Sequence, residues 1–458
     1  MKALALAALA AACSSTSPGT PDASDAALER TVAARYAGDR TGACIAAAVI
    51  DGDTVQRASL CADPSRARPT DGAFEIGSVS KTMTASLLAD LIDQGKIALG
   101  DPIARYLPPG TLVPTFQGAP ILVAHLVTHT AGLPSLPSRL APASPDDPYA
   151  QLTAADLLAS LADVTLPQAP GARWAYSNFG GMVLSDIVSR LAGTDFEAAA
   201  RARLFDPLGM AHAYVDHPPA GVTAATGHRS TGEPTAAWHF APELAGVGGV
   251  RATLDDMIGY ARAELGHGDA HTVEILARTH AAVELGRPRP PGDPEMAMAW
   301  IRLPLDGRAV LAHDGGTGGF TSFVAIDPDV DRAIVVLADT ELVNLGGLGE
   351  LALHLLDPSL PLAGPRTVVA PGAALLAALA GRYEVVGLTV TLRADAGALV
   401  AALDDGSELA FEYDSHGDFF SHDVAALLTP VRGDDGRQTF ALVQDGRPEI
   451  ATRLPDAR

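Results

Sequence analysis

The sequence predicts an α+β fold in which a large domain precedes a small all-β domain, and three observations support this. Strand-like segments lie near both ends of the large region, and helical patterns with Pro/Gly-rich breaks fill residues 101–304 between them. Short turns such as Asp-Pro-Asp at 327–329 join the later strands, which indicates an antiparallel sheet. The length of 458 residues and the 48% content of hydrophobic residues allow a large core and a second domain. We expect a sheet built from both ends of the large domain, flanked by helices, with a helical region inserted between its strands.

The first two strands are expected in GACIAAAVIDGDTVQRASLC, around an Asp-Gly-Asp turn. If Gly52 and Asp53 form the two-residue loop, Cys44 lies directly opposite Cys61, whereas a loop of Asp51 and Gly52 puts the cysteines out of register. Two alternatives therefore stay open: a cross-strand disulfide between Cys44 and Cys61, or two buried free thiols.

A long helix is expected from FEIGSVSK, residues 74–81, because apolar residues recur at helical spacing in the following TMTASLLADLIDQGKI. Further helical patterns are DLLASLADV, GMVLSDIVSRLAG and TLDDMIGYARAEL. Strands return at RAVLAHDGG, FTSFVAIDPD and DRAIVVLAD, and the helix GGLGELALHLL closes a domain expected to span residues 27–358.

The pattern changes again after a Pro-rich linker at residues 359–371. Segments such as GLTVTLRAD, ELAFEYD and TFALVQDG alternate in polarity or run short between turn residues. They predict a small β domain over residues 372–458. We find no internal repeat and no transmembrane span in the sequence.

The first 13 residues, MKALALAALAAAC, predict export. A positive start and a short apolar stretch precede small residues and Cys13. The segment resembles the lipoprotein signal of bacteria, in which the cysteine is lipidated, although Leu9 stands one place earlier than the usual leucine. We expect lipidation of Cys13, with cleavage and release as the alternative, a flexible tether at residues 14–26, and a periplasmic or cell-envelope location.

The charge of the chain restricts its partners. A formal net charge of -22 and an acidic isoelectric point disfavour nucleic acid and anionic membrane surfaces, because like charges repel. We expect a small-molecule or peptide substrate and membrane contact only through the N-terminal lipid anchor. Nothing in the sequence indicates the oligomeric state.

Lysine is scarce in this chain, which makes Lys81 notable. Only Lys2, Lys81 and Lys96 are lysines among 32 basic residues. Arginine stays protonated at any workable pH, whereas a desolvated lysine can lose its proton. Lys81 follows Ser78 by three residues, so both side chains would lie on one face of the first helical turn. There the amine could accept the serine proton, and the free N–H groups of the helix N-terminus could bind an oxyanion.

FEIGSVSK resembles the active-site signature of the class C β-lactamases and their relatives, the serine penicillin-binding proteins, D-aminopeptidases and esterases. The resemblance spans roughly residues 28–356 and implies the β-lactamase/transpeptidase-like fold, with Ser78 as the nucleophile. Tyr176 and Asn178, in PGARWAYSNFGG, match the family's Tyr-x-Asn element. The resemblance implies that Tyr176 takes and returns the proton at the reacting centre, and that Asn178 binds the substrate amide and holds Lys81.

The family's third element, Lys-Thr-Gly, differs here. AHDGGTGGF aligns as His313, Asp314 and Gly315, with Gly316 giving a second oxyanion N–H from the strand edge. A second alignment, which starts at Gly316 and gives Thr317 a polar role, stays open. A lysine would carry a full charge toward a substrate carboxylate, whereas His313 is largely neutral at pH 7 unless its surroundings raise its pKa.

Two further stretches similar to the family, HLVTHTAGLP and VGGVRATLDDM, are interpreted as architectural. His125 and His129 have the i, i+4 spacing of helical zinc ligands, but the glutamate of His-Glu-x-x-His is missing. Asp327, Asp329 and Asp331 lack the glycine and the terminal glutamate of a calcium loop, so a hairpin turn explains them. No metal or organic cofactor is expected.

The expected function is that of an exported serine hydrolase. It would act through a Ser78 acyl-enzyme on β-lactams or related amides such as D-Ala peptides. The alternatives are a carboxylesterase or D-aminopeptidase of the same fold, or a non-catalytic protein that senses penicillin or binds the cell wall.

Overall fold

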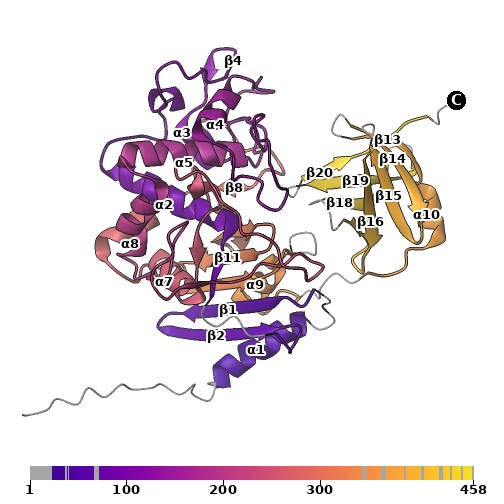
Figure 1. Ribbon diagram of the computed structural model, residues 1–458, viewed down its shortest axis with the longest axis horizontal. Coiled ribbons are helices and arrows are strands. Elements are labelled where there is room, and N and C mark those ends of the chain that lie inside the picture. The colour runs from indigo at the N-terminus through magenta and orange to yellow at the C-terminus, as the bar shows by residue number, and fades with distance from the viewer. Residues whose placement is uncertain are drawn as a thin grey trace, which may run out of the picture.

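The computed structural model describes residues 23–455 apart from short gaps at 37–38, 40, 67–71, 343–346, 363–367, 386–387, 404–406, 422–425, 434–435 and 445–446. The predicted signal sequence, with Cys13, lies outside the described residues. Figure 1 shows the large domain with the C-terminal β domain beside it, so the predicted fold class is confirmed. None of the described helices is long and apolar enough to span a bilayer.

A seven-stranded antiparallel sheet forms the centre of the large domain, in the order β2-β1-β12-β11-β10-β9-β8. Its strands are β1 (Cys44–Asp51), β2 (Thr54–Cys61), β8 (Glu295–Met296), β9 (Ile301–Leu305), β10 (Arg308–Gly316), β11 (Thr321–Asp327) and β12 (Arg332–Ala338). The ladder between β1 and β12 runs from Ile45 opposite Ala338 to Asp51 opposite Arg332. The sheet is therefore built from both ends of the domain, as the sequence predicts.

Strands β8 and β9 correct the prediction that residues 101–304 are mostly helical. β9 contains Pro304, which lowers its strand signal, because proline cannot donate a ladder hydrogen bond. The partner strand β8 pairs only with Ile301 and Arg302, so Pro304 stands on an edge that β8 leaves uncovered. Because no neighbouring strand of the described residues lies along this edge, the N–H that Pro304 lacks would have formed no ladder hydrogen bond there.

Helices cover both faces of the sheet (Figure 1). On the outer face are α1 (Ala23–Arg35), which packs on β2, and α9 (Gly349–Leu356), which packs on β11 and β12. The helices of the inner side are α2 (Ser80–Asp93), α3 (Val123–Val127), α4 (Ala154–Leu161), α5 (Asn178–Ala192), α6 (Phe196–Ala200), α7 (Leu254–Glu264) and α8 (Ala270–Ala277). Short strands β3 (Gly72–Glu75), β6 (Thr223–Ala224) and β7 (Arg251–Ala252) form a small second sheet, and β4 (Thr115–Phe116) pairs with β5 (Ala119–Pro120).

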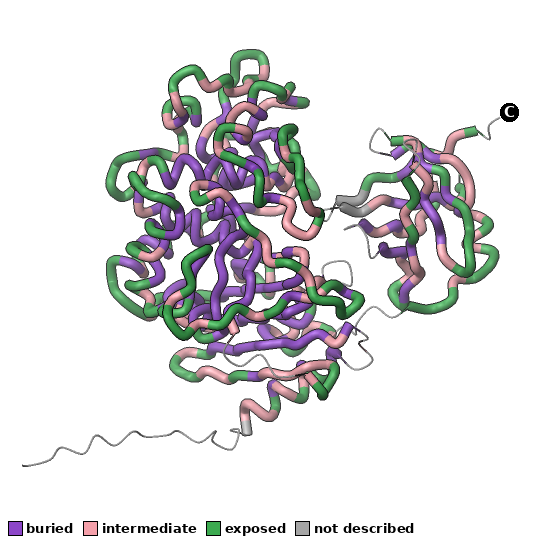
Figure 2. The backbone as a smooth tube through the Cα atoms, viewed as in Figure 1, coloured by how far each residue is buried: buried purple, intermediate pink, exposed green. Residues whose placement is uncertain are grey.

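Each central strand contributes to two cores, because successive side chains point to opposite faces. In β1, Ala46, Ala48 and Ile50 belong to the large inner core, and the intervening Ile45, Ala47 and Val49 belong to the smaller outer core. Figure 2 shows buried backbone throughout the middle of the large domain. A strand buried on both sides has the continuous apolar sequence CIAAAVI rather than an alternating one.

Helix α1 shortens the predicted tether. The structure begins this helix at Ala23, so residues 23–26, which the sequence assigns to the tether, are helical. Leu28 and Val32, one turn apart, are buried in the outer core. The polar composition before residue 27 concealed the helix start.

The C-terminal domain is a nine-stranded antiparallel sheet that curls on itself. Its strands are β13 (Gly381–Val385), β14 (Leu388–Asp395), β15 (Ala398–Leu403), β16 (Glu408–Tyr413), β17 (Phe419–Phe420), β18 (Leu427–Arg432), β19 (Gln438–Gln444), β20 (Arg447–Ile450) and β21 (Thr452–Arg453). The strands at the two ends of the sheet order, β20 and β21, are separated in the chain by Ala451 alone. The sheet must therefore bend into a barrel-like form. The domain is not purely β, because the strong helix formers AALLAAL make α10 (Ala373–Leu379).

The β1–β2 hairpin carries a disulfide. Asp51 pairs with Thr54, so Gly52 and Asp53 form the loop and Cys44 lies opposite Cys61, with an S–S distance of 2.03 Å. The bond closes a loop with a sequence separation of 17 residues.

Replacing both Cys44 and Cys61 by serine is expected to lower the free energy of unfolding by about 2–3 kcal/mol, because the open chain gains loop entropy in the unfolded state. Chemical denaturation of oxidised wild type and of the double variant measures the difference. A denaturation midpoint unchanged by the two substitutions would contradict the expectation.

Candidate active site

The nucleophile candidate Ser78 lies at the start of α2, where strand β3 ends. Residues Gly77–Val79 form a 3-10 turn that leads directly into the helix. Gly77 has φ +49°, and a Cβ placed on it would lie 2.7 Å from the backbone N of Gly316. Only glycine fits this contact, which brings the end of β10 against the turn that carries Ser78.

Two side chains hydrogen-bond to the Ser78 hydroxyl. Lys81 Nζ donates to Ser78 Oγ at 2.9 Å, and the Tyr176 hydroxyl donates to the same oxygen at 2.7 Å. Tyr176 comes just before helix α5, whose N-cap Ser177 accepts the N–H of Gly180 at 2.9 Å. The cap fixes the chain direction at this helix start, so Tyr176 is held over Ser78 although 98 residues separate them in sequence.

Lys81 is buried and has three acceptors around its amine. Besides Ser78 Oγ, these are Asn178 Oδ1 at 2.9 Å and the carbonyl oxygen of Val247 at 2.7 Å. Burial lowers the pKa of Lys81 to about 7, against a smaller raising effect of the Asp314 carboxylate. A neutral amine has two N–H groups and one lone pair, so it can donate to Asn178 and Val247 and still accept the Ser78 proton.

The rate of acylation is expected to depend on pH through this amine. Below about pH 7 Lys81 is protonated, so kcat/KM should fall about tenfold per pH unit there and level off above it. A pH profile of acylation by a substrate that does not titrate in this range measures this. A flat profile across neutral pH would show that Lys81 is not the base.

His313, on β10, is buried close to Lys81. Its Nδ1–H donates to the backbone oxygen of Asp314 at 2.6 Å. Burial is the main cause that lowers the pKa of His313, and the Lys81 charge adds to it against the opposing effect of Asp314. The strand therefore has a neutral imidazole at pH 7 where the family's Lys-Thr-Gly element has a charged lysine.

The backbone favours the alignment that starts at His313. β10 remains in ladder register with β11 through Gly315 and Gly316, opposite Ser322 and Thr321. Thr317, the polar residue of the other alignment, is buried, and its side chain hydrogen-bonds to Glu75.

One edge of β10 is open beside the nucleophile. On the β9 side the ladder ends at Ala312 opposite Ile301, whereas on the β11 side it continues to Gly316. Residues 313–316 thus have no strand partner on the β9 side among the described residues. An extended ligand can add as a further strand at this edge.

The two stretches interpreted as architectural both contact the catalytic candidates. The His129 ring packs on Tyr176 with centroids 4.4 Å apart, and its Nδ1 accepts the N–H of Ser177 at 3.2 Å. Val247, in the second stretch, supplies a carbonyl acceptor for Lys81. Neither contact can be predicted from a single sequence. Any residue can supply a backbone carbonyl, and the stacking of two distant rings requires no particular spacing.

The two histidines of the first stretch do not converge as metal ligands. His125 accepts the Leu122 N–H within α3, which ends at Val127, and His129 has a left-handed φ of +55° beyond that end. Burial lowers the pKa of His125 to about 4 and that of His129 well below its usual value. The described residues contain no group of three or more side chains suited to hold a metal ion.

A buried ion pair joins strand β3, which leads to Ser78, to strand β7, which follows the Val247 segment that contacts Lys81. Glu75, at the end of β3, accepts from Arg251 Nη2 at 3.3 Å, and the residues are paired between β3 and β7. Next to them Ile76 N–H donates to Val250 O at 3.0 Å, and Val250 N–H donates to Ser80 Oγ at 3.1 Å. The pair therefore fixes the segment of Val247 against the start of α2.

Comparison with known proteins identifies relatives of this fold and site. The family model described as Beta-lactamase matches residues 28–349. The D-alanyl-D-alanine-carboxypeptidase/endopeptidase AmpH of Escherichia coli (strain K12) is 28% identical over 295 residues, which cover 61% of this chain and 74% of that protein. Penicillin-binding protein 4 of Amycolatopsis lactamdurans is 30% identical over 364 residues, which cover 74% of this chain and 92% of that protein.

A solved structure extends the likeness of fold into the C-terminal domain. The octameric penicillin-binding protein homologue from Pyrococcus abyssi has a TM-score of 0.60 at 18% identity, and the match covers 93% of this chain and 99% of that one. Because the family model matches most of the chain and its signature residues meet in one site, the chain belongs to the β-lactamase family of serine hydrolases.

Proposed function

We propose that this protein is an acyl-enzyme amidase that hydrolyses peptides with D-residues at the scissile bond and is acylated by β-lactams. The observation that carries the proposal is the convergence of Lys81 and Tyr176 on the Ser78 hydroxyl, at 2.9 and 2.7 Å. A serine needs such a base to become a nucleophile. The open edge of residues 313–316 suits an extended peptide.

In the proposed reaction Ser78 Oγ attacks the scissile carbonyl while its proton passes to neutral Lys81, directly or through Tyr176. The N–H groups of Ser78 and Gly316 stabilise the oxyanion. The C–N bond breaks when the leaving nitrogen receives the proton from Tyr176, which leaves an ester on Ser78. Water then attacks the ester by the same proton path in reverse and releases the acid.

The charge at the site affects whether peptides with a free C-terminal carboxylate are preferred over those with a C-terminal amide. His313 is neutral at pH 7 and Lys81 has a pKa of about 7, while Asp314 next to them is exposed. A free carboxylate next to the scissile bond therefore meets no fixed cation on this strand. We expect peptides with a C-terminal amide to react about as well as those with a free acid.

The printed names of the relatives support amide chemistry without selecting one bond. One is a D-alanyl-D-alanine-carboxypeptidase/endopeptidase, one is a penicillin-binding protein, and another, 29% identical, is a β-lactamase of Escherichia coli (strain K12). β-Lactam hydrolysis is thus the second candidate. It differs from the first only in how fast water releases the acyl group from Ser78.

Labelling and turnover test the proposal together. A fluorescent penicillin or a fluorophosphonate should label the wild type and fail to label Ser78→Ala. A panel of a D-Ala-D-Ala peptide, its C-terminal amide, a chromogenic cephalosporin and a short-chain nitrophenyl ester should then show fastest turnover of a peptide. Fastest turnover of the ester would make the protein an esterase, and no adduct with either label would favour a non-catalytic binder.

We also propose that the protein acts outside the cytoplasm. The chemical modification of its N-terminus tests this location. The apolar start before Cys13 and the Cys44–Cys61 bond support this location, since disulfides persist in oxidising compartments. Mass spectrometry of the N-terminus from a membrane fraction should find Cys13 lipidated. An N-terminus that retains Met1 would overturn the proposal.

A further inference from the structure

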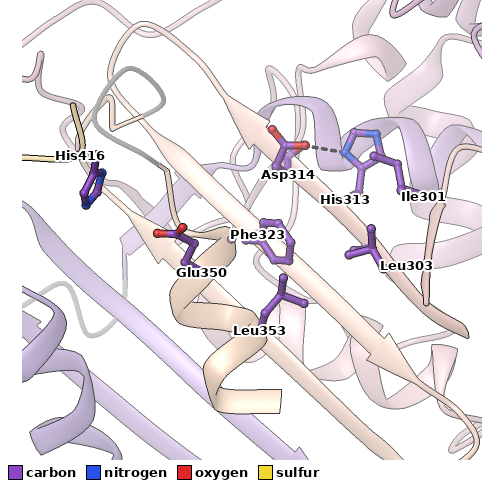
Figure 3. Close-up of a pocket in the computed structure, with 10 residues that line it drawn as sticks. Ile301, Leu303, His313, Asp314, Phe323, Glu350, Leu353 and His416 are labelled. Atoms are coloured by element: carbon purple, nitrogen blue, oxygen red, sulfur yellow. Dashed lines mark hydrogen bonds between the residues drawn. The ribbon is translucent and has the colours of Figure 1, made fainter. Parts of the chain in front are cut away.

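Gly316, whose N–H is the proposed oxyanion donor, is the last residue of β10. This strand also carries His313 and Asp314, which line the pocket drawn in Figure 3. Residues 317–320 form a tight turn between β10 and β11, closed by a hydrogen bond of 3.0 Å from its first N–H to its last backbone oxygen. The direction of the Gly316 N–H therefore depends on what holds this turn.

The turn is held by the segment that contains Gly227 and His228. The His228 N–H donates to the Gly319 oxygen at 3.1 Å. A Cβ placed on Gly227 would lie 2.6 Å from Phe320 Cε2 and 3.0 Å from Gly319 Cα, so only glycine allows the two backbones to approach this closely. A displacement of His228 is therefore passed directly to the turn.

Asp339, the first residue after β12, fixes His228 and is only 5% exposed. Its backbone oxygen accepts the His228 N–H at 2.9 Å and the His228 Nδ1–H at 3.0 Å. Its carboxylate accepts from Arg66 Nη2 at 2.5 Å and from the Cys44 N–H at 2.8 Å. Arg66 Nη2 is also 3.2 Å from His228 Nε2, so Arg66, His228 and Asp339 form one connected group, the Asp339 cluster.

The Asp339 cluster is anchored on the hairpin that carries the disulfide. The Asp339 N–H donates to the Cys44 oxygen at 3.1 Å, and Cys44 is bonded to Cys61. Arg66 Nη1 donates to the Gly42 oxygen at 2.6 Å, just before β1. Loss of any of these partners would leave a buried charge or polar group without compensation, so the cluster has one preferred geometry. It thus connects the central sheet to the turn after β10.

We propose that the Asp339 cluster positions the Gly316 N–H toward the oxyanion, through the turn of residues 317–320. Asp339 acts through the turn and not on the reacting atoms, so it is a positioning residue. The inference rests on the proposed function, because it requires an acyl-enzyme reaction whose oxyanion the Gly316 N–H stabilises. Such a donor acts on the transition state and on tetrahedral adducts more than on bound substrate. A displaced N–H should therefore lower kcat and leave KM nearly unchanged.

Asp339→Asn tests the cluster by the removal of one charge. The amide keeps the size and one acceptor oxygen, but its NH2 group replaces the oxygen that accepts from Arg66. For the substrate that wild type turns over fastest, kcat should fall about tenfold and KM should change by less than about twofold. An unchanged kcat, or a loss that appears only in KM, would overturn the proposal.

Phenylboronic acid reports on the oxyanion donor directly. Ser78 Oγ adds to its boron to form a tetrahedral anion, while the serine proton passes to the enzyme base. Asp339→Asn should weaken the binding of this inhibitor about tenfold, as it weakens kcat. A variant with a reduced kcat that binds phenylboronic acid as tightly as wild type would show that the cluster does not act on the donor.

Asp51→Asn is the matched control. Asp51 pairs with Arg332 at 3.0 Å, and the two residues stand opposite each other at the other end of the same β1–β12 ladder. This control should keep the wild-type kcat and the wild-type affinity for phenylboronic acid. Circular dichroism checks that both variants are folded. Equal losses in Asp51→Asn and Asp339→Asn would overturn the positioning role.

Gly227→Ala moves the same turn without a change of charge. Its Cβ pushes against Gly319 and Phe320, so kcat and the affinity for phenylboronic acid should fall together, as in Asp339→Asn. The loss in the double variant should be smaller than the product of the two single losses, because both substitutions displace one turn. Losses that multiply fully would show that Asp339 acts by another route.

Arg66→Gln repeats the test from the more exposed partner, whose side chain is 23% exposed against 8% for Asp339. It should give the same joint loss of kcat and of boronate affinity. If Arg66→Gln is folded and keeps both at the wild-type level, the proposal is overturned even where Asp339→Asn fails to fold.

Two readouts distinguish this inference from the proposed function. The pH profile of acylation in Asp339→Asn should keep the wild-type midpoint near pH 7, since Lys81 is not part of the cluster. A shifted midpoint would assign the effect to Lys81 and contradict the positioning role. A wild type that neither turns over a substrate nor binds phenylboronic acid contradicts the proposed function, and the positioning role falls with it. A wild type that does both, matched by Asp339→Asn, contradicts the positioning role alone.

Discussion

Lys81→Arg is expected to lower kcat/KM by about 10³-fold, while the protein remains folded. Arginine keeps a positive charge at this position but cannot give up its proton, so it cannot accept the one from Ser78. Gly181 packs closely against the Lys81 side chain, since a Cβ on Gly181 would lie 3.0 Å from Lys81 Cε.

The measurement is acylation kinetics with a fluorescent penicillin, with circular dichroism as the check on folding. Lys96→Arg is the matched control, because Lys96 is exposed in the turn after α2 and should tolerate the same change without loss of rate. An active Lys81→Arg enzyme would show that the amine serves as a fixed cation, and the tyrosine would then have to be the base.

Glu75→Gln is expected to destabilise the protein by about 3–5 kcal/mol, because it leaves Arg251 charged and without its buried partner. Glu75 and Arg251 are both only 5% exposed. Glu75 also accepts the Trp238 N–H at 2.9 Å, and Arg251 Nη2 donates to the Trp238 backbone oxygen at 2.7 Å. The substitution thus loosens three segments together.

The activity of Glu75→Gln should fall even where the variant stays folded, because the Glu75–Arg251 ion pair fixes the segment whose Val247 carbonyl accepts from Lys81. Chemical denaturation gives the stability, and the pH profile of acylation shows whether the Lys81 pKa has moved. Asp255→Asn, which breaks the exposed pair with Arg57, is the comparison and should have little effect. Equal effects of the two substitutions would contradict a special role for the buried pair.

Much of the fold could be predicted from local patterns. The apolar runs of β1, β11 and β12 and the short turns between them indicate an antiparallel sheet, and these features survive in the structure. The start of α1 could not be predicted, because it follows a polar segment. Helix α10 has the composition of a helix, but it is too short to show an apolar periodicity, and only Leu379 is fully buried in it. Strand β9 was concealed by Pro304, whose position on an open edge depends on the whole sheet.

The site divides in the same way. Ser78 and Lys81 could be named from their spacing on one helical turn, and Tyr176 and Asn178 from the resemblance to the family's Tyr-x-Asn element. The carbonyl of Val247 could not, since any residue supplies a carbonyl. The low pKa of Lys81 follows from burial, which only the packed structure provides.

The ladder between β1 and β12 has a consequence for biosynthesis. It joins Ile45 to Ala338, so almost the entire large domain must be synthesised before β1, which can pair early with β2, finds its second partner β12. Contacts this distant along the chain slow folding, and the apolar surface of β1 stays unsatisfied meanwhile. Holding chaperones should therefore capture nascent chains that stop before residue 332 and release those that extend past it.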